Sequence, residues 1–217
     1  MAEEPRHDDK LARILRTAAA IFADKGYHEA SIRDISRATG ISLSGLYYYF
    51  RSKEELLFLI QDHCFGTVLD NLERLLEGVM DPHRRLRLLV ENHLRFFVSN
   101  MKEMKVLSHE AGSLTGDYRK RVNEKKRRYT ELCTATLQEL RPASPIDLRV
   151  ATFALFGMMN WIYNWYHADR DVPVAELAED LSQLFLQGYL GDAGLVPAGA
   201  AERAPGEARP SIWRRTS

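Results

Sequence analysis

Apolar residues recur at helical spacing along most of this 217-residue chain, and this feature constrains its fold most. The first set of them is Leu11, Ile14, Leu15, Ala18 and Phe22. Gly26 follows as a natural stop, and the helical pattern continues to Leu190 with breaks at 112–116, 142–145 and 169–173, where Gly or Pro occur. No segment alternates with period two and no hairpin signal occurs. The sequence therefore predicts an all-α fold.

Two short helices are predicted directly after Gly26. Ser31, with Asp34 three residues later, is close to a capping box, and Gly40 ends the helix that it begins. Ser42 can cap a second short helix that carries the three tyrosines at 47–49. The two helices and their glycine-containing turn form the pattern of a helix-turn-helix, whose second helix enters the major groove of DNA. Alternatively, the pattern is an ordinary connection, since helices of any all-α protein need turns.

A long helix is predicted to follow. Ser52, with Glu55 three residues later, begins a helical pattern over 56–76, which Gly78 and Pro82 break. The first third of the chain therefore holds three short helices and the start of a long one.

Three consecutive tyrosines are unusual for a protein core, because each buried phenol must find a hydrogen-bond partner. Small residues at 42–45 precede them, and small residues let a backbone approach base edges closely. We therefore expect some of these groups to touch something outside the protein.

The string SIRDISRATGISLSGLYYYFRSKEELL, within 11–57, resembles the N-terminal DNA-binding domain of TetR-family transcriptional regulators. The matching points are Phe22, Gly26, Tyr27, Ser31, Ile32, Ile35, Gly40, Gly45, Leu46, Tyr47, Phe50 and Ser52 to Leu56. Tyr49 departs from the family, which often has His there. The resemblance implies an N-terminal three-helix helix-turn-helix DNA-binding domain at 1–52, with its motif at about 31–50. It also implies a C-terminal helical ligand-binding and dimerisation domain at 53–190.

The resemblance also implies roles for single residues on double-stranded operator DNA. Ser31, Arg33 and Lys53 would hold phosphates, and Tyr47 and Tyr49 would reach phosphates or bases. Tyr48 would be a groove contact or a wedge against the first helix, whereas Leu46 and Phe50 would be core. The candidates for sequence specificity are Ser42, Leu43, Ser44 and Gly45.

The C-terminal part is predicted to dimerise. Residues 150–166 are apolar nearly all round, so a helix there would be buried on several sides. The last predicted helix is amphipathic, with Leu177, Leu181, Leu184 and Phe185 on one stripe. Following the family, two such helices from each of two subunits would form a four-helix bundle, and the dimer would bind a palindromic operator. Ordinary packing within a monomer is the alternative. The Gly-, Ala- and Pro-rich segment 191–217 is predicted to be a disordered tail.

Basic residues are concentrated in the middle of the chain, although its formal net charge is zero. Seven of the ten residues from Arg119 to Arg128 are basic. This stretch is either a solvated surface or a site for an anionic ligand, because the planar guanidinium of Arg suits phosphate. The candidates for such contacts are Arg121, Lys125, Lys126 and Arg128.

The segment from Phe153 to Gly191 resembles the C-terminal end of TetR-type regulators of fatty-acid degradation, which respond to acyl-CoA thioesters. The resemblance implies a repressor that a small-molecule effector of this class releases. The pocket-lining candidates are residues of types that are more often plain core than ligand contacts: Phe96, Phe97, Met101, Tyr129, Met158, Trp161, Ile162 and Trp165. One alternative is a repressor of an efflux system that responds to an apolar aromatic ligand. A remote alternative is a helical adaptor without DNA binding.

Other functional classes have little support in the sequence. His63, His93 and His109 lack metal-ligand spacing, and no phosphate-binding loop or nucleophile motif occurs, so neither an enzyme nor a cofactor is predicted. Cys64 and Cys133 are interpreted as small buried hydrophobes. No apolar run reaches the length of a membrane span and the N-terminus is polar, so we expect a cytoplasmic protein.

Overall fold

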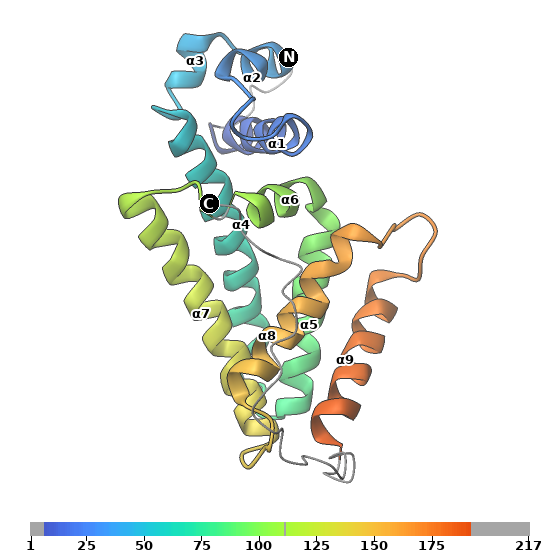
Figure 1. Cartoon of the computed structure of the whole chain (residues 1–217). Helices are drawn as coiled ribbons and strands as arrows, with labels where there is room; N and C mark the ends of the chain where they lie inside the picture. Colours follow the sequence, from blue (N-terminus) through green and yellow to red (C-terminus); the bar gives the residue numbers. More distant parts are fainter. Residues whose placement is uncertain (1–6, 111, 192–217) are drawn as a thin grey trace, which may run out of the picture.

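The computed structural model describes residues 7–110 and 112–191, and in this part of the chain every regular element is helical (Figure 1). The elements are α1 His7–Lys25, α2 Ile32–Thr39, α3 Leu43–Tyr47, α4 Lys53–Leu76, α5 Pro82–Ser99, α6 Met101–His109, α7 Gly116–Leu140, α8 Leu148–Asn160, the 3-10 helix η1 Trp161–Asn164 and α9 Val174–Leu190. The predicted all-α fold is therefore confirmed.

The predicted helix boundaries at the N-terminal end follow from local capping. Ser31, Ser42 and Ser52 each accept a hydrogen bond from a backbone N–H of the helix that they begin. Gly40 ends α2 with a φ of 71°, a left-handed conformation that glycine adopts without steric cost. Pro82 occupies the first turn of α5, where its missing N–H removes no helical hydrogen bond.

The third helix is shorter than predicted. α3 ends at Tyr47, so Tyr48 and Tyr49 lie beyond it in the turn that leads to α4. The backbone N–H groups of Tyr49 and Phe50 both donate to the carbonyl of Leu46, which tightens the chain there. This turn brings the Phe50 side chain into the core, where it is almost fully buried.

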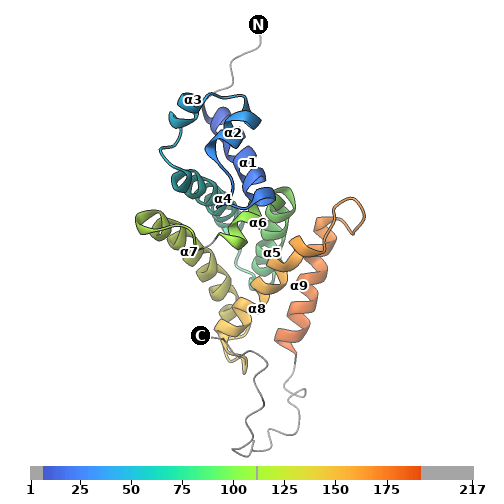
Figure 2. The ribbon, with the colours of Figure 1, turned by 45° about the horizontal axis from the view of Figure 1, so that its top comes forward.

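The long helix α4 joins the two parts of the molecule. The helices α1, α2 and α3 gather around its N-terminal end, and the remaining helices lie along the rest of it (Figure 1). α5 contacts α4, α6, α7, α8 and α9, so it is the central helix of the C-terminal part. α6 contacts both α1 and α5, and Figure 2 shows it lying where the two parts meet.

A break at Asn100 was not predicted. α5 ends at Ser99 and α6 begins at Met101, and the Asn100 amide Nδ2 donates to the carbonyl of Phe96 at 2.7 Å. Side-chain bonds of this kind compete with the helical ladder. Because the apolar residues keep a helical spacing through the break, the periodicity concealed it.

The prediction of one continuous helix over 150–166 was wrong. α8 ends at Asn160, and the chain continues as the 3-10 helix η1. The Asn160 side chain binds His93 Nε2 on α5, with its Oδ1 at 3.1 Å, and asparagine and aromatic residues are weak helix formers. The predicted tail at 191–217 lies outside the described residues except for Gly191.

No helix among the described residues is long and apolar enough to cross a membrane. The same residues contain no group of three His, Cys, Asp or Glu side chains placed to hold a metal ion.

Candidate functional site

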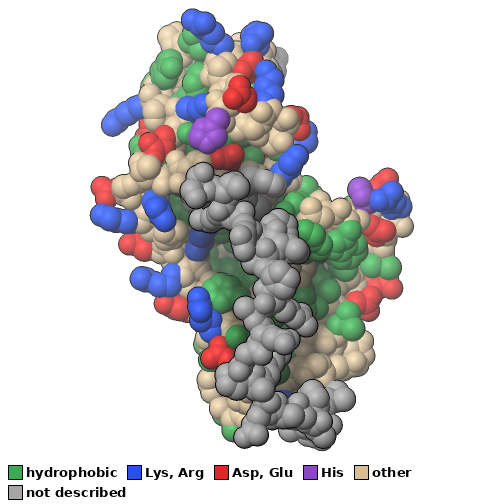
Figure 3. Space-filling model, in the orientation of Figure 1, with side chains coloured by type: hydrophobic (Ala, Val, Ile, Leu, Met, Phe, Trp, Pro, Cys, Tyr) green, Lys and Arg blue, Asp and Glu red, His purple; other side chains and the backbone are tan. Residues whose placement is uncertain are grey.

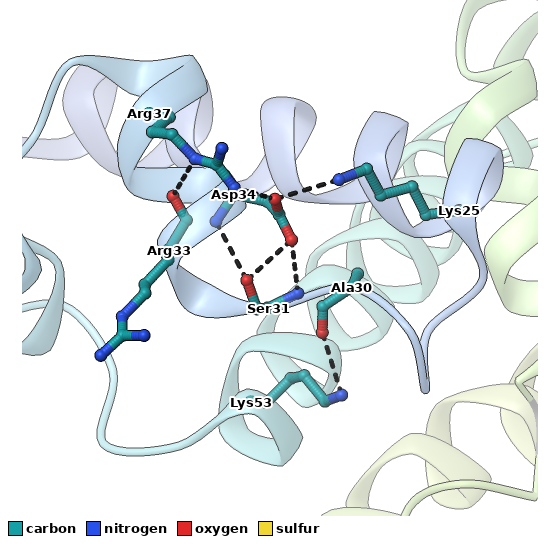
Figure 4. Close-up of polar contacts among 7 residues, drawn as sticks. All are labelled: Lys25, Ala30, Ser31, Arg33, Asp34, Arg37 and Lys53. Atoms are coloured by element: carbon teal, nitrogen blue, oxygen red, sulfur yellow. Dashed lines mark hydrogen bonds and ion pairs between the residues drawn. The ribbon is translucent and has the colours of Figure 1, made fainter.

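The start of α2 is held by a network around Asp34 (Figure 4). The Ser31 hydroxyl donates to Asp34 Oδ2 at 2.7 Å and accepts from the Asp34 N–H, and the Ser31 N–H donates to Asp34 Oδ2. Lys25 on α1 and Arg37 on α2 form ion pairs with Asp34 Oδ1 at 3.0 and 2.6 Å. The hydrogen bonds from Ser31 and the ammonium of Lys25 lower the pKa of Asp34, so this carboxyl stays ionised.

Ser31, predicted to hold a phosphate, therefore acts as a helix cap, because its only hydroxyl proton is directed to Asp34. Arg33 is exposed, and Figure 4 shows its guanidinium pointing away from this network. The phosphate contact of Arg33 stays a prediction.

Lys53 is placed differently from its predicted role. Its ammonium donates to the carbonyls of Tyr27, His28 and Ala30 at 3.0, 3.0 and 3.1 Å, and it lies 4.7 Å from the centre of the Tyr27 ring. An ammonium has three protons, so these bonds use all of them. Lys53 thus holds the turn between α1 and α2 against the start of α4 and does not present a charge to an outside phosphate.

The predicted specificity residues on α3 lie at the surface. Ser42, Leu43, Ser44 and Tyr47 are exposed, while Leu46 on the opposite side of the helix is fully buried. The Ser42 and Ser44 hydroxyls lie 3.1 Å apart, and Ser42 also caps the helix. α3 therefore presents a small polar surface with one aromatic side chain to the outside.

Gly45 has a packing role that the sequence did not reveal. A Cβ at this position would lie 2.9 Å from Ile41 Cγ2 and 3.2 Å from Ser42 Oγ. The close approach of the turn to α3 therefore requires glycine, whether or not a base lies near it.

The three tyrosines differ in exposure. Tyr48 is 75% exposed, Tyr47 is about half exposed, and Tyr49 is partly buried against the core. The rings of Tyr48 and Tyr49 meet edge to face at 5.3 Å, and the Tyr47 ring lies 6.2 Å from that of Phe50. Tyr47 and Tyr48 thus extend the exposed surface of α3 into the following turn.

A second candidate site is a cavity of about 500 Å³ in the C-terminal part. Its walls come from α4, α5, α6, α7 and α8, and most of them are apolar or aromatic. The lining residues are Cys64, Phe65, Val68, His93, Phe96, Phe97, Met104, Leu107, Lys126, Tyr129, Thr130, Phe153, Phe156 and Asn160. This size and this composition are typical of a small-molecule site.

Few polar groups line this cavity. Burial lowers the pKa of His93 to about 4, so its ring is neutral at pH 7. The Tyr129 hydroxyl is buried and makes no hydrogen bond of regular geometry among the described residues; burial raises its pKa, and the neighbouring Asn92 side chain partly offsets this rise. Lys126 Nζ lies 4.7 Å from the centre of the Phe65 ring, and partial burial lowers its pKa. It is the only charged side chain lining this cavity in the described part of the chain.

The basic stretch on α7 divides into residues with different partners. Lys125 is paired with Asp62 on α4 at 2.7 Å, and Arg128 with Glu73 at 2.9 Å. Arg121 lies over the Phe58 ring at 4.8 Å. Of the four predicted phosphate contacts, only Lys126 lines the cavity. Figure 3 shows Lys and Arg side chains along α7, beside a hollow whose floor carries hydrophobic side chains.

The structure brings together only part of the predicted pocket. Phe96, Phe97 and Tyr129 line the cavity, but Met101 and Met158 are partly buried elsewhere, and Ile162 is core. Trp161 and Trp165 are 62% and 45% exposed, because they follow the outer side of α8. The cavity residues on α4 and α6 were missed, since nothing in an apolar helical pattern distinguishes a cavity wall from filled core. The other lining residues that were missed are His93, Thr130, Phe153, Phe156 and Asn160.

The outer side of α8 forms an exposed apolar face. Its large members are Val150, Phe153 and Trp161, and Leu184 of the neighbouring helix α9 is also exposed. Ala154 and Gly157 lie on the same side and are exposed, and a Cβ at Gly157 would meet nothing within 4 Å. Hydrophobic side chains are visible at the surface where α8 passes into η1 (Figure 3). Contiguous faces of this kind mark interaction sites more often than plain surface.

Two family models match this chain, one over its N-terminal part and one over its C-terminal part. Residues 14–60 match the model of "Bacterial regulatory proteins, tetR family", and residues 79–189 match that of "Tetracyclin repressor-like, C-terminal domain". A similar solved structure is a TetR-family transcriptional regulator from Bordetella parapertussis 12822. It is 35% identical, with a TM-score of 0.79, over 85% of this chain and 97% of that one.

Two further relatives are named for a bound ligand or for a metabolic process. The structure of AibR in complex with isovaleryl coenzyme A and operator DNA is 26% identical, with a TM-score of 0.72, over 81% of this chain and 97% of that one. The fatty acid metabolism regulator protein of Bacillus subtilis (strain 168) is 21% identical over 82% of this chain and 95% of its own length.

Proposed function

Because the chain belongs to the TetR family of bacterial transcriptional regulators, we propose that it is a homodimeric repressor that an acyl-CoA thioester releases from its operator. The observation that carries this proposal is the aromatic cavity with Lys126 at its wall, which adjoins the helix α6 that contacts α1. In this proposal residues 1–52 bind DNA, and residues 53–190 bind the effector and the second subunit.

The DNA contacts come from the exposed side of α3 and its flanks. Ser42, Leu43, Ser44 and Tyr47 would enter the major groove, where hydroxyl and apolar contacts discriminate between bases. Arg33, exposed on α2, would hold a phosphate and fix the register. Tyr48 and Tyr49 follow at the end of α3 and would reach the backbone of the same half-site.

The dimer would form through α8 and α9. The exposed face with Val150, Phe153, Trp161 and Leu184 supplies the apolar area, and small residues between them allow two helices to approach closely. Burying about 800 Å² per subunit is typical of a stable interface. Two subunits would then present two α3 helices to successive major grooves, as a palindromic operator requires.

The interface can be tested by light scattering on the purified protein. We expect Trp161→Arg to convert the dimer to monomer, since it places a charge on the apolar face. Leu75→Arg is the matched control, because Leu75 is exposed on α4 away from this face. A Trp161→Arg protein that remains dimeric at micromolar concentration would contradict the proposed interface.

The effector class follows from the chemistry of the cavity. An acyl chain would lie among the phenylalanines, and the anionic coenzyme A part would meet Lys126 and the basic residues of α7 at the edge. The relatives that are named for isovaleryl coenzyme A and for fatty acid metabolism support this choice.

The coupling between the cavity and DNA would pass through α4 and α6. Cys64 on α4 and Met104 and Leu107 on α6 line the cavity, and both helices contact α1. Gln61 Nε2 also donates to the carbonyl of Glu110 at the end of α6. A ligand that displaces α6 would therefore shift α1 and the spacing of the two α3 helices. A coupling free energy of about 1–3 kcal/mol suffices for such a switch.

The decisive experiment is operator release. An operator is first selected from random duplexes with the purified protein, and its dissociation is followed by fluorescence anisotropy at constant salt. Acyl-CoA thioesters of several chain lengths are compared with free coenzyme A and free fatty acids. We expect release by thioesters alone. If no thioester changes the DNA affinity, the effector class is wrong, and uncharged aromatic ligands become the next class to test.

A further inference from the structure

Two polar atoms at the cavity wall lack hydrogen-bond partners among the described residues: His93 Nδ1 and the Tyr129 hydroxyl. Both side chains are more than nine-tenths buried, at 5% and 6% exposure, and both line the cavity. Their ring centres lie 5.9 Å apart, and each ring is about 6 Å from that of Phe156. The two side chains therefore lie beside each other in the wall of an otherwise aromatic pocket.

The hydrogen-bond roles of these atoms are defined by their surroundings. Asn160 Oδ1 lies 3.1 Å from His93 Nε2 and can only accept, so Nε2 carries the proton. The ring is neutral, because burial lowers its pKa to about 4, and Nδ1 therefore presents a lone pair. The Tyr129 hydroxyl can donate. The site thus offers one acceptor and one donor to whatever enters it.

We propose that the effector carries a hydroxyl group on its acyl part, which donates to His93 Nδ1 and accepts from the Tyr129 hydroxyl. This inference rests on the proposed function, and it narrows the effector class from acyl-CoA thioesters to hydroxyacyl thioesters. A plain methylene chain would leave both buried groups without partners. The thioester group offers only acceptors, so it could satisfy Tyr129 but not Nδ1.

The stacking of the rings holds His93 in place for this contact. The His93 ring stacks on Phe97 at 4.1 Å and is tied to Asn160 at the end of α8. Sites that are built to bind a hydroxyl discriminate strongly against the analogue that lacks it, because buried polar groups would then stay unpaired. A preference of about ten-fold or more is the expected size.

The test compares matched pairs of thioesters by isothermal titration calorimetry on the full chain. Each pair is a straight-chain acyl-CoA and its 3-hydroxyacyl counterpart, at four, eight and twelve carbons. We expect at least one hydroxyacyl member to bind about ten-fold more tightly than its partner. In Tyr129→Phe, the hydroxyacyl member of that pair should bind at most about three-fold more tightly than its straight-chain partner.

Tyr189→Phe is the matched control variant. Tyr189 is also buried, but its hydroxyl donates to the carbonyl of Leu137 at 3.3 Å, away from the cavity. This variant should lose stability and keep the hydroxyl preference. Tyr129→Phe should lower the melting temperature less than Tyr189→Phe does, because only the neighbouring Asn92 side chain lies close to the Tyr129 hydroxyl and no hydrogen bond with regular geometry is lost.

Three results would overturn the inference. The first is equal affinity within every pair, with thioesters still binding, which would leave the proposed function intact. The second is a preference that survives in Tyr129→Phe. The third is a fall in the melting temperature of Tyr129→Phe at least as large as that of Tyr189→Phe, which would show that a partner within the protein holds the hydroxyl. Binding by no thioester at all would instead overturn the proposed effector class, and this inference with it.

Discussion

Replacing Lys53 by methionine separates a structural role from a DNA contact. Methionine keeps much of the apolar stem but removes the ammonium, which donates to three carbonyls in the turn between α1 and α2. Two of these bonds, to Tyr27 and Ala30, are partly buried, and a hydrogen bond to a charged donor contributes about 1.5–3 kcal/mol. The contact with the Tyr27 ring adds about 0.5–1 kcal/mol.

Part of this free energy is recovered when water reaches the freed carbonyls, and the three bonds share one donor group. We therefore expect Lys53→Met to lower the free energy of unfolding by about 2–3 kcal/mol. For a chain of this size that corresponds to a fall of about 4–12 °C in melting temperature. Differential scanning calorimetry of the DNA-free protein measures it directly.

Arg33→Met is the matched control for this variant. Arg33 is exposed on α2, so its loss should leave the melting temperature within about 2 °C. It should instead weaken DNA binding and reduce the slope of log affinity against log salt by about one. The reasoning on Lys53 is refuted if Lys53→Met melts like the wild type and shows this reduced salt slope.

Three further predictions concern acid, capping and thiol chemistry. His93 is buried in its neutral form, and burial lowers its pKa from 6.5 to about 4. Its contribution to the free energy of unfolding is therefore complete above pH 6.5 and declines as the pH falls toward 4. Urea unfolding should show that the free energy of unfolding falls by about 2 kcal/mol between pH 7 and 5, and that His93→Gln makes this fall smaller. An equal fall in the variant would assign the pH dependence to other groups. Ser31→Ala should cost about 1 kcal/mol in thermal unfolding through loss of the α2 cap, and no cost would contradict the capping role. Burial raises the pKa of Cys64 and of Cys133 to about 12, so both thiols should react with a thiol reagent only on unfolding, and rapid reaction of the folded protein would contradict this.

Local sequence signals located most of the helix ends correctly. A cap acts within four residues of the helix that it begins, so Ser31 with Asp34, Ser42 and Ser52 could be identified without knowing the fold. The left-handed turn at Gly40 is equally local. The short range of these signals also explains two of the errors in the predicted helices. The break at Asn100 leaves the apolar spacing intact, and the end of α8 at Asn160 coincides with a bond to His93, 67 residues away in sequence.

Family membership was also evident from the sequence, because the motif at 31–56 combines these local signals with a core pattern at fixed spacing. The matches to two families of transcriptional regulators confirm the prediction that the chain is a transcriptional regulator and not an enzyme.

Side-chain partners distant in the sequence were decided only by the tertiary structure. Lys53 could be recognised as a cation near the motif, but the carbonyls that bind it lie 23 to 26 residues earlier. In the same way, the sequence does not distinguish Lys125, Lys126 and Arg128. The position of α4 pairs Lys125 and Arg128 with acidic residues and leaves Lys126 at the cavity. The cavity itself exists because five helices meet without filling the space between them. Helical periodicity records which side of each helix is buried, whereas the gap between those sides depends on how the helices pack.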